Sequence, residues 1–106
     1  MKYKCSHILL SYYEAEAASS TRTLGEAFAE AERLTKQIKQ GKISFQDCAA
    51  KNSHCASGPR NGGDLGWKDD FEMPPDFERA VKSISIGDIG EPFVTNVGVH
   101  IILRTG

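Results

Sequence analysis

A chain of 106 residues can bury one hydrophobic core but not two, so we expect a single domain over residues 1–106. Thirteen basic and fourteen acidic side chains leave a net charge of −1, and the sequence has no dense Lys/Arg patch that could bind the phosphates of a nucleic acid. No apolar run approaches the ~20 residues that span a bilayer, which argues against a membrane protein. No secretory segment follows Met1, and this abrupt start is compatible with a module cut from a longer chain.

The first residues predict a β-strand. Over residues 3–10, YKCSHILL, a period of two places His7 on the same face as Cys5 and Leu9. The next stretch, SYYEAEAASS, is small and acidic without a clear period, so we expect a loop there. The chain therefore begins with one strand and a polar connection.

Two capped helices are predicted after this loop. Thr23 and Glu26 have the spacing of a capping box, apolar residues follow at helical spacing, and Gly41 supplies a left-handed stop. Ser44 then caps a shorter helix whose buried face begins at Phe45.

The second half of the chain predicts turns, a short strand, a helix and a hairpin. The glycines and proline of residues 58–63 favour turns and close backbone approach, and no Gly-Lys-Ser/Thr follows to make a phosphate loop. DLGW is long enough for a short strand, and Pro74 and Pro75 suit the start of a helix. Residues 91–104 predict a closing hairpin with its bend near residues 96–98. This order indicates an α+β fold with a small, mostly antiparallel sheet covered by helices.

Each terminal strand carries one histidine at a corresponding place. His100 shares a strand face with Ile102 and Arg104, much as His7 lies with its own apolar neighbours. If the two strands pair, the imidazoles can meet on one face of the sheet. A strand histidine is more commonly a core or edge residue bonded to the backbone, so the pattern alone leaves its role open.

The cysteines leave further interpretations open. Their number is odd and no CxxC spacing occurs, which favours free thiols in the cytoplasm or nucleus. Cys5, His7, His54 and Cys55 carry suitable ligand atoms, but their spacings are not those of structural zinc sites, so we expect no metal. Cys55 in its Gly-rich segment could serve a thiol hydrolase with a distant histidine as base, although no such signature surrounds it. An idle or buried Cys55 is the simpler alternative.

Four segments, taken in order, resemble the parvulin family of peptidyl-prolyl cis-trans isomerases over nearly the whole chain. CSHILL is similar to the family's opening strand, GGDLGW to its central loop, MPPDFERAV to its M-x-x-x-F-x-x-A helix, and EPFVTNVGVHIILRTG to its closing hairpin. HIILRT and NSHCAS look closest to the phosphate-directed Pin-type branch. The resemblance implies a β-α-α-α-β-α-β-β order and a four-stranded sheet.

The resemblance also implies a set of catalytic residues. In parvulins two strand histidines lie side by side beneath the active site, and His7 and His100 match them. Thr95 matches a threonine whose hydroxyl joins their hydrogen-bond network, and Cys55 matches a position that is cysteine or aspartate. We therefore expect Cys55 to act through hydrogen bonds or electrostatics and not as a nucleophile.

The implied substrate is a proline-containing segment of a protein. Leu65, Met73 and Phe77 match the apolar pocket that receives the proline ring, although Met73 and Phe77 alone would more commonly be core residues. We expect a monomeric isomerase that needs no cofactor and binds neither nucleic acid nor membranes. A proline-binding or chaperone module without turnover is the alternative, and a Cys-His hydrolase is a more distant one.

Three departures from the Pin-type pattern affect specificity. The loop after the first strand is acidic at Glu14 and Glu16 where Pin-type members carry a basic cluster, and only Arg22 is basic. His54 stands where an acid is usual, and Val97 where relatives have serine or an aromatic residue. We therefore expect an isomerase without a strong phosphate dependence.

Overall fold

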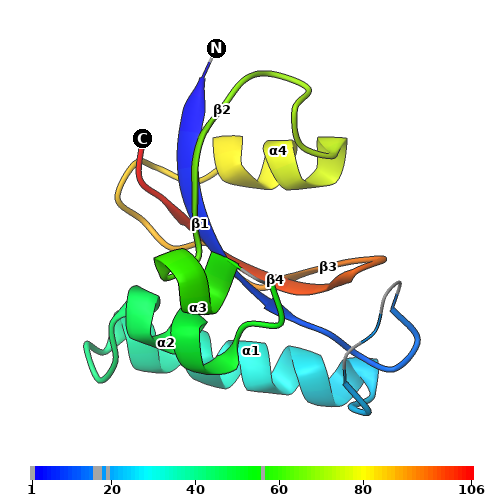
Figure 1. The fold of residues 1–106 in the computed structure, drawn as a ribbon. Coiled ribbons are helices and arrows are strands. Elements are labelled where there is room, and N and C mark those ends of the chain that lie inside the picture. Colours follow the sequence, from blue (N-terminus) through cyan, green and yellow to red (C-terminus); the bar gives the residue numbers. More distant parts are fainter. Residues whose placement is uncertain (1, 16–17, 19, 56) are drawn as a thin grey trace.

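The computed structural model describes residues 2–15, 18, 20–55 and 57–106 (Figure 1). Its elements are, in chain order, β1 (Tyr3–Leu10), α1 (Leu24–Lys39), α2 (Phe45–Asn52), α3 (Ser57–Asn61), β2 (Asp64–Lys68), α4 (Pro75–Lys82), β3 (Phe93–Thr95) and β4 (Gly98–Arg104). This order confirms the predicted α+β class and the β-α-α-α-β-α-β-β arrangement. None of the helices in the described part of the chain has the length and apolarity that crossing a bilayer requires.

The four strands form one antiparallel sheet in the order β2-β1-β4-β3. The two terminal strands are thus its central strands and run side by side (Figure 1). Their register pairs His7 with Ile102 and Leu9 with His100. Because side chains alternate along a strand and paired residues share a face, the two histidines lie diagonally on the same face of the sheet.

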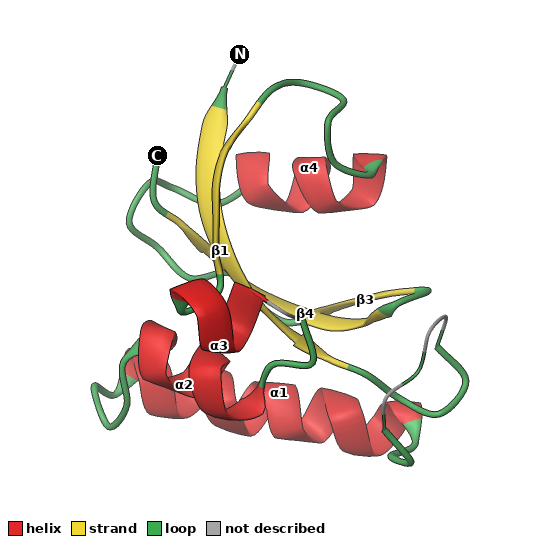
Figure 2. Cartoon of the chain, viewed as in Figure 1, coloured by secondary structure: helices red, strands yellow, loops and turns green. Residues whose placement is uncertain are grey.

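The helices cover the sheet from two sides, with α1 and α2 on one face and α4 on the other (Figure 2). The strand residues buried beneath α1 and α2 are Ile8, Leu10, Val99 and Ile101. The buried residues on the opposite face, with α4, are Tyr3, Cys5, Phe77, Val81 and Ile102. We call this second group the α4-side core. Alternating residues of β1 and β4 therefore feed two separate cores, and full burial of each large apolar side chain contributes about 1.5–3 kcal/mol.

The helix boundaries follow the capping signals of the sequence. Glu26 N–H donates to Thr23 Oγ1 at 3.1 Å and Thr23 N–H donates to Glu26 Oε1 at 2.9 Å, which confirms the capping box. Gly41 follows the end of α1 with a φ of 74°. Ser44 Oγ accepts from Asp47 N–H at 3.1 Å and begins α2. Caps of this kind contribute about 1 kcal/mol each.

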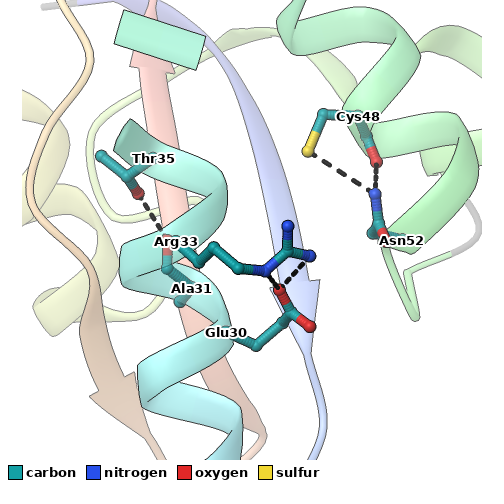
Figure 3. Close-up of polar contacts among 6 residues, drawn as sticks. All are labelled: Glu30, Ala31, Arg33, Thr35, Cys48 and Asn52. Atoms are coloured by element: carbon teal, nitrogen blue, oxygen red, sulfur yellow. Dashed lines mark hydrogen bonds and ion pairs between the residues drawn. The ribbon is translucent and has the colours of Figure 1, made fainter. Parts of the chain in front are cut away.

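Several polar side chains on α1 and α2 find partners within their own helix (Figure 3). The buried Thr35 hydroxyl donates to Ala31 O at 2.8 Å, and Asn52 Nδ2 donates to Cys48 O at 3.1 Å. The Arg33 guanidinium pairs with Glu30, one turn earlier on α1. The buried helix faces can therefore pack against the sheet without leaving these groups unpaired.

The short helix α3 lies where the residue pattern predicts turns, so that prediction is wrong for residues 58–61, whereas the third helix implied by the family resemblance is present. Gly58 explains the difference, because a Cβ there would lie 2.5 Å from Ala49 O of α2. This close packing on α2 selects a helical turn despite the weak propensity of glycine, and Pro59 falls in the first turn where its missing N–H is not needed. Gly62 and Gly63 then form the turn, with φ values of 63° and 86°.

Candidate active site

The two strand histidines are stacked and buried in the α4-side half of the fold. Their ring centroids lie 5.8 Å apart with an interplanar angle of 25°, and His7 and His100 are only 6% and 4% exposed. Burial lowers the pKa of His7 to about 4. Burial, and then the charge of a protonated His7, lower the pKa of His100 to about 4. Both imidazoles are therefore neutral at pH 7.

Thr95 connects His100 to the hairpin bend. Thr95 Oγ1 and His100 Nε2 are 2.7 Å apart, and the same hydroxyl accepts from Val97 N–H at 3.3 Å. The Thr95 hydroxyl has two acceptor lone pairs and one proton, so it can hold both Val97 N–H and the imidazole at the same time. Tyr12 Oη donates to Thr95 O at 3.2 Å and ties the hairpin to the segment after β1. Val97 thus contributes its backbone N–H to the hydrogen bonds around Thr95.

His7 joins this arrangement through ring contacts. Neither of its ring nitrogens, nor Nδ1 of His100, has a hydrogen-bond partner among the described residues. Within that part of the chain, the histidine–threonine network therefore consists of the His100–Thr95 contact, with His7 stacked on His100. Among the described residues no hydrogen bond connects the two imidazoles to each other.

Two phenylalanines complete the aromatic cluster around the histidines. Phe77 of α4 meets both imidazoles edge-on, with centroids 5.7 Å away in each case. Phe93 of β3 stacks on His100 at 5.0 Å and 16°. Sequence analysis did not select Phe93. Counting back from the hairpin bend would have found it, because the register places Phe93 directly opposite His100.

The three residues predicted to hold a proline ring meet in the same region. Phe77 is buried, and Leu65 and Met73 are half-buried and packed against the α4-side core, as is Phe93. Leu65 comes from β2, Met73 from the approach to α4, and Phe77 from the helix itself. Side chains from β2, from the β2–α4 connection and from α4 thus pack on the α4-side core, and Phe77 among them contacts both imidazoles.

Cys55 follows two residues, Ser53 and His54, that are hydrogen-bonded to the end of β1. Leu9 N–H donates to Ser53 Oγ at 3.0 Å, and His54 N–H donates to Leu9 O at 2.7 Å. The His54 side chain is also engaged, since Ser11 N–H donates to its Nδ1 at 2.8 Å. Burial, and then the charge of Arg22, lower the pKa of His54. His54 therefore holds the segment in place as a neutral acceptor.

This anchoring determines the surroundings of Cys55. The edge of β1 that faces away from β4 pairs with β2 along its first half. Further along this edge His7 N–H donates to Gly63 O at 2.9 Å, and residues 53–54 bind next to it. A Cβ on Gly63 would lie 2.5 Å from His7 O, so this close approach requires glycine. Cys55 follows directly, half-buried, with its Sγ accepting from Ser57 Oγ at 3.2 Å.

The residues with metal-ligand atoms are dispersed. In the described ranges no three His, Cys, Asp or Glu side chains are grouped closely enough to hold a metal ion. Cys5 is fully buried in the α4-side core, and burial raises the pKa of its thiol to about 11. A protonated thiol is a poor ligand, and His54 Nδ1 already accepts a backbone hydrogen bond.

Comparison with known proteins places the chain in a family. The Rotamase family, described as the PPIC-type PPIASE domain, matches residues 7–106. Over 115 residues the chain is 34% identical to peptidyl-prolyl cis-trans isomerase Pin1 of Digitalis lanata, covering 99% of this chain and 97% of that protein.

Solved structures extend this similarity to the fold. Peptidyl-prolyl isomerase ESS1 from Candida albicans matches with a TM-score of 0.92 at 30% identity, over 99% of this chain and 63% of that one. NmPin, the parvulin of Nitrosopumilus maritimus, matches with a TM-score of 0.75 at 30% identity, over 99% and 96%. The chain belongs to the PPIC-type, or parvulin, family of peptidyl-prolyl cis-trans isomerases. It is an enzyme that acts on proline-containing polypeptides.

Proposed function

We propose that the site accelerates rotation about X-Pro bonds by binding the twisted amide, without a covalent intermediate and without proton transfer by the histidines. Rotation has to overcome a barrier of ~20 kcal/mol because it breaks the resonance of the C–N bond. Catalysis then requires only that the site binds the twisted form better than either planar form. The observation that carries this proposal is the buried, neutral imidazole pair directly beside an apolar cluster.

In this proposal the apolar cluster grips the proline ring. Leu65, Met73 and Phe77 are the pocket residues, and Phe93 closes the side next to His100. With the ring held, the carbonyl of the preceding residue is free to turn. An apolar site that excludes water also favours the twisted amide, which is less charge-separated than the planar amide.

The imidazole pair and Thr95 act as positioning residues. His100 is held between the rings of His7 and Phe93 and fixed by the Thr95 hydroxyl. Such a stack keeps the floor of the site rigid and uncharged, which suits a reaction that moves no proton. Cys55, with its sulfur bonded by Ser57, supplies a polar contact at the edge of the site.

Substitution of Cys55 tests the non-covalent mechanism. Cys55→Asp should retain measurable kcat/KM on an X-Pro peptide, because a carboxylate can replace the sulfur as a hydrogen-bond acceptor. Cys55→Ala should lose part of the activity, and Ser57→Ala, which keeps the thiol but removes its donor, should lose less. NMR exchange spectroscopy on the peptide measures all three. An inactive Asp variant, together with an acyl-thiol intermediate trapped in the unaltered protein, would establish the hydrolase alternative.

We propose further that the enzyme does not depend strongly on phosphate before the proline. In the loop after β1 Glu14 is exposed, while Glu16 lies outside the described residues. The charge of Arg22 contributes to the lowered pKa of both His54 and Glu26, so this arginine lies within electrostatic reach of a carboxylate. A carboxylate near an incoming phosphate repels it by roughly 1 kcal/mol at about 4 Å in water, which offsets a single arginine.

Matched peptides with Ser, phosphoSer, Glu or an apolar residue before proline test this specificity. We expect kcat/KM for phosphoSer-Pro to stay within tenfold of the unmodified peptide, because no cluster of basic side chains is available to pair with a dianion. Arg22→Ala should change that ratio little. An advantage of tenfold or more for phosphoSer that disappears in Arg22→Ala would show that one arginine replaces the usual basic cluster.

We also propose that residues 1–106 act as a monomeric domain in the cytoplasm or nucleus, on peptide segments and not on nucleic acid or membranes. The three cysteines are present as free thiols, two of them buried, which supports a reducing compartment. The near-neutral net charge of −1 supports a peptide as partner. Sedimentation of the protein at several concentrations measures its oligomeric state directly.

A further inference from the structure

The turn between β2 and α4 holds a phenylalanine in an unusual backbone conformation. Phe71 has a φ of 68° and is the one non-glycine residue in the described ranges with a positive φ. Glu72 N–H donates to Asp69 O at 3.2 Å, so Phe71 is the third residue of a β-turn with the type II pattern. That position favours Gly or Asn, and a bulky side chain is unfavourable there because its Cβ crowds the backbone.

Three polar contacts hold this turn against its surroundings. Phe71 N–H donates to Glu78 Oε1 at 2.8 Å, Lys82 Nζ pairs with Asp70 at 2.6 Å, and Lys68 Nζ pairs with Glu72 at 3.2 Å. The turn is therefore tied to both β2 and α4. Strained residues persist where their neighbours over-determine the conformation, and they cluster at sites that contact ligands.

Folding alone does not account for a phenylalanine at this place. The Phe71 side chain is 90% exposed, so it buries little apolar surface that could offset the unfavourable backbone conformation. Glycine would satisfy the backbone at lower cost. An exposed aromatic ring on a turn whose backbone is held in place has instead the properties of a binding contact.

The ring borders an open groove of about 570 Å³ between the turn and α4, with Phe71, Met73 and Pro75 as its apolar lining. The charged side chains of its α4 wall are Glu78, Arg79 and Lys82. These charges are compensated by ion pairs. Lys82 pairs with both Asp70 and Glu78. Arg79 pairs with Asp76. The groove therefore selects an uncharged apolar side chain over a charged one.

Met73 connects this groove to the pocket proposed for the proline ring. It lines the groove and also packs against the α4-side core beside Phe77. An extended peptide advances about 3.3–3.6 Å per residue, so two to four residues cover the roughly 10 Å diameter of a helix. A peptide whose proline occupies the pocket can therefore reach the groove with a nearby residue.

We propose that this groove, which we call the Phe71 groove, binds an apolar side chain two to four residues from the substrate proline. Phe71 is its specificity-determining contact. The inference rests on the proposed function, because the proline pocket defines the register of the peptide. The enzyme then prefers sequences with an aliphatic or aromatic residue near the X-Pro bond, by about fivefold for partial burial of a leucine.

Peptides with a common Ala-Pro centre test the proposal. One set carries a single Leu two, three or four residues to either side of the proline, and the reference peptide carries Gly at all those positions. NMR titration measures the Kd of each, and exchange spectroscopy measures kcat/KM. We expect at least one Leu position to bind about fivefold tighter than the reference, and this ratio to fall close to one in Phe71→Gly. Glycine suits the positive φ, so this variant should fold.

Ile86→Ala is the matched control. Ile86 is another large apolar side chain, 66% exposed, and it does not line the groove. Its substitution should leave the Leu-to-Gly ratio unchanged. Equal Kd values for all peptides in the unaltered protein, or a preference that survives in Phe71→Gly, would overturn the proposal. Absence of isomerisation of the reference peptide would instead contradict the proposed function, and the Kd ratios would still decide on the groove.

Discussion

The His100→Ala variant should lose most of its isomerase activity and about 2–4 kcal/mol of folding free energy. His100 is 4% exposed and lies between the rings of His7 and Phe93. Its removal leaves a cavity at the floor of the site and takes the nitrogen partner from the Thr95 hydroxyl. The cavity and the lost hydrogen bond lower the folding free energy. Activity falls because the rings that remain can collapse into the cavity and close the pocket.

A comparison with Thr95→Val separates positioning from packing. This variant keeps the imidazole ring in place but removes the hydroxyl that fixes it, so it should cost only about 1 kcal/mol of stability. The kcat should fall while KM changes little, because the apolar pocket is intact. Urea unfolding and exchange spectroscopy measure the two effects on the same samples. Unchanged unfolding and unchanged kcat/KM in His100→Ala would remove the imidazole pair from the mechanism.

The folding free energy should fall as the pH is lowered from about 6.5 towards 4. Burial lowers the pKa of both His7 and His100 to about 4, whereas in the unfolded chain each imidazole titrates near 6.5. Between these values the unfolded state binds protons that the folded state excludes. Stability is therefore fully present above pH 6.5 and is lost progressively down to pH 4, by roughly 3 kcal/mol for each histidine.

Urea unfolding at half-unit steps from pH 7.5 to 5 measures this slope. In that window carboxylates of ordinary pKa near 4 remain ionised, so the change belongs to the histidines. His7→Phe keeps an aromatic ring on His100 but removes one titrating group, so it should reduce the slope and leave the contributions of His100 and of His54, whose pKa is also lowered. A folding free energy that stays constant down to pH 5 would show that the imidazoles are protonated inside the folded protein.

Much of the fold follows from local patterns in the sequence. The alternation of residues 3–10 predicts which face of β1 carries His7, and the Thr23–Glu26 spacing predicts the start of α1. These features depend on neighbours within a few residues. The pairing of β1 with β4 does not, because nothing in either strand specifies its partner. For that adjacency, and for the meeting of the histidines, only the resemblance to a known family was informative.

The features that sequence analysis missed depend on the register of the hairpin or on contacts between segments. Gly58 forms part of a helix because α2 lies against it, which its own propensity opposes. Phe93 stacks on His100 through the hairpin register. Phe71 looks like an ordinary loop residue until its φ and its exposed ring are known. Backbone strain of this kind is set by the surrounding structure and leaves no periodic signal in the sequence.

The cis–trans exchange rate of one Ala-Pro peptide, measured by NMR with increasing amounts of protein between pH 6 and 8, tests the central claim most directly. The uncatalysed exchange takes tens to hundreds of seconds. A neutral, non-covalent site predicts a large acceleration that grows in proportion to the protein and stays constant over this pH range, because both imidazoles are uncharged throughout. An exchange rate unaffected by stoichiometric protein would indicate a binding module, and a rate that follows an ionisation near pH 6.5 would indicate proton transfer by the histidines.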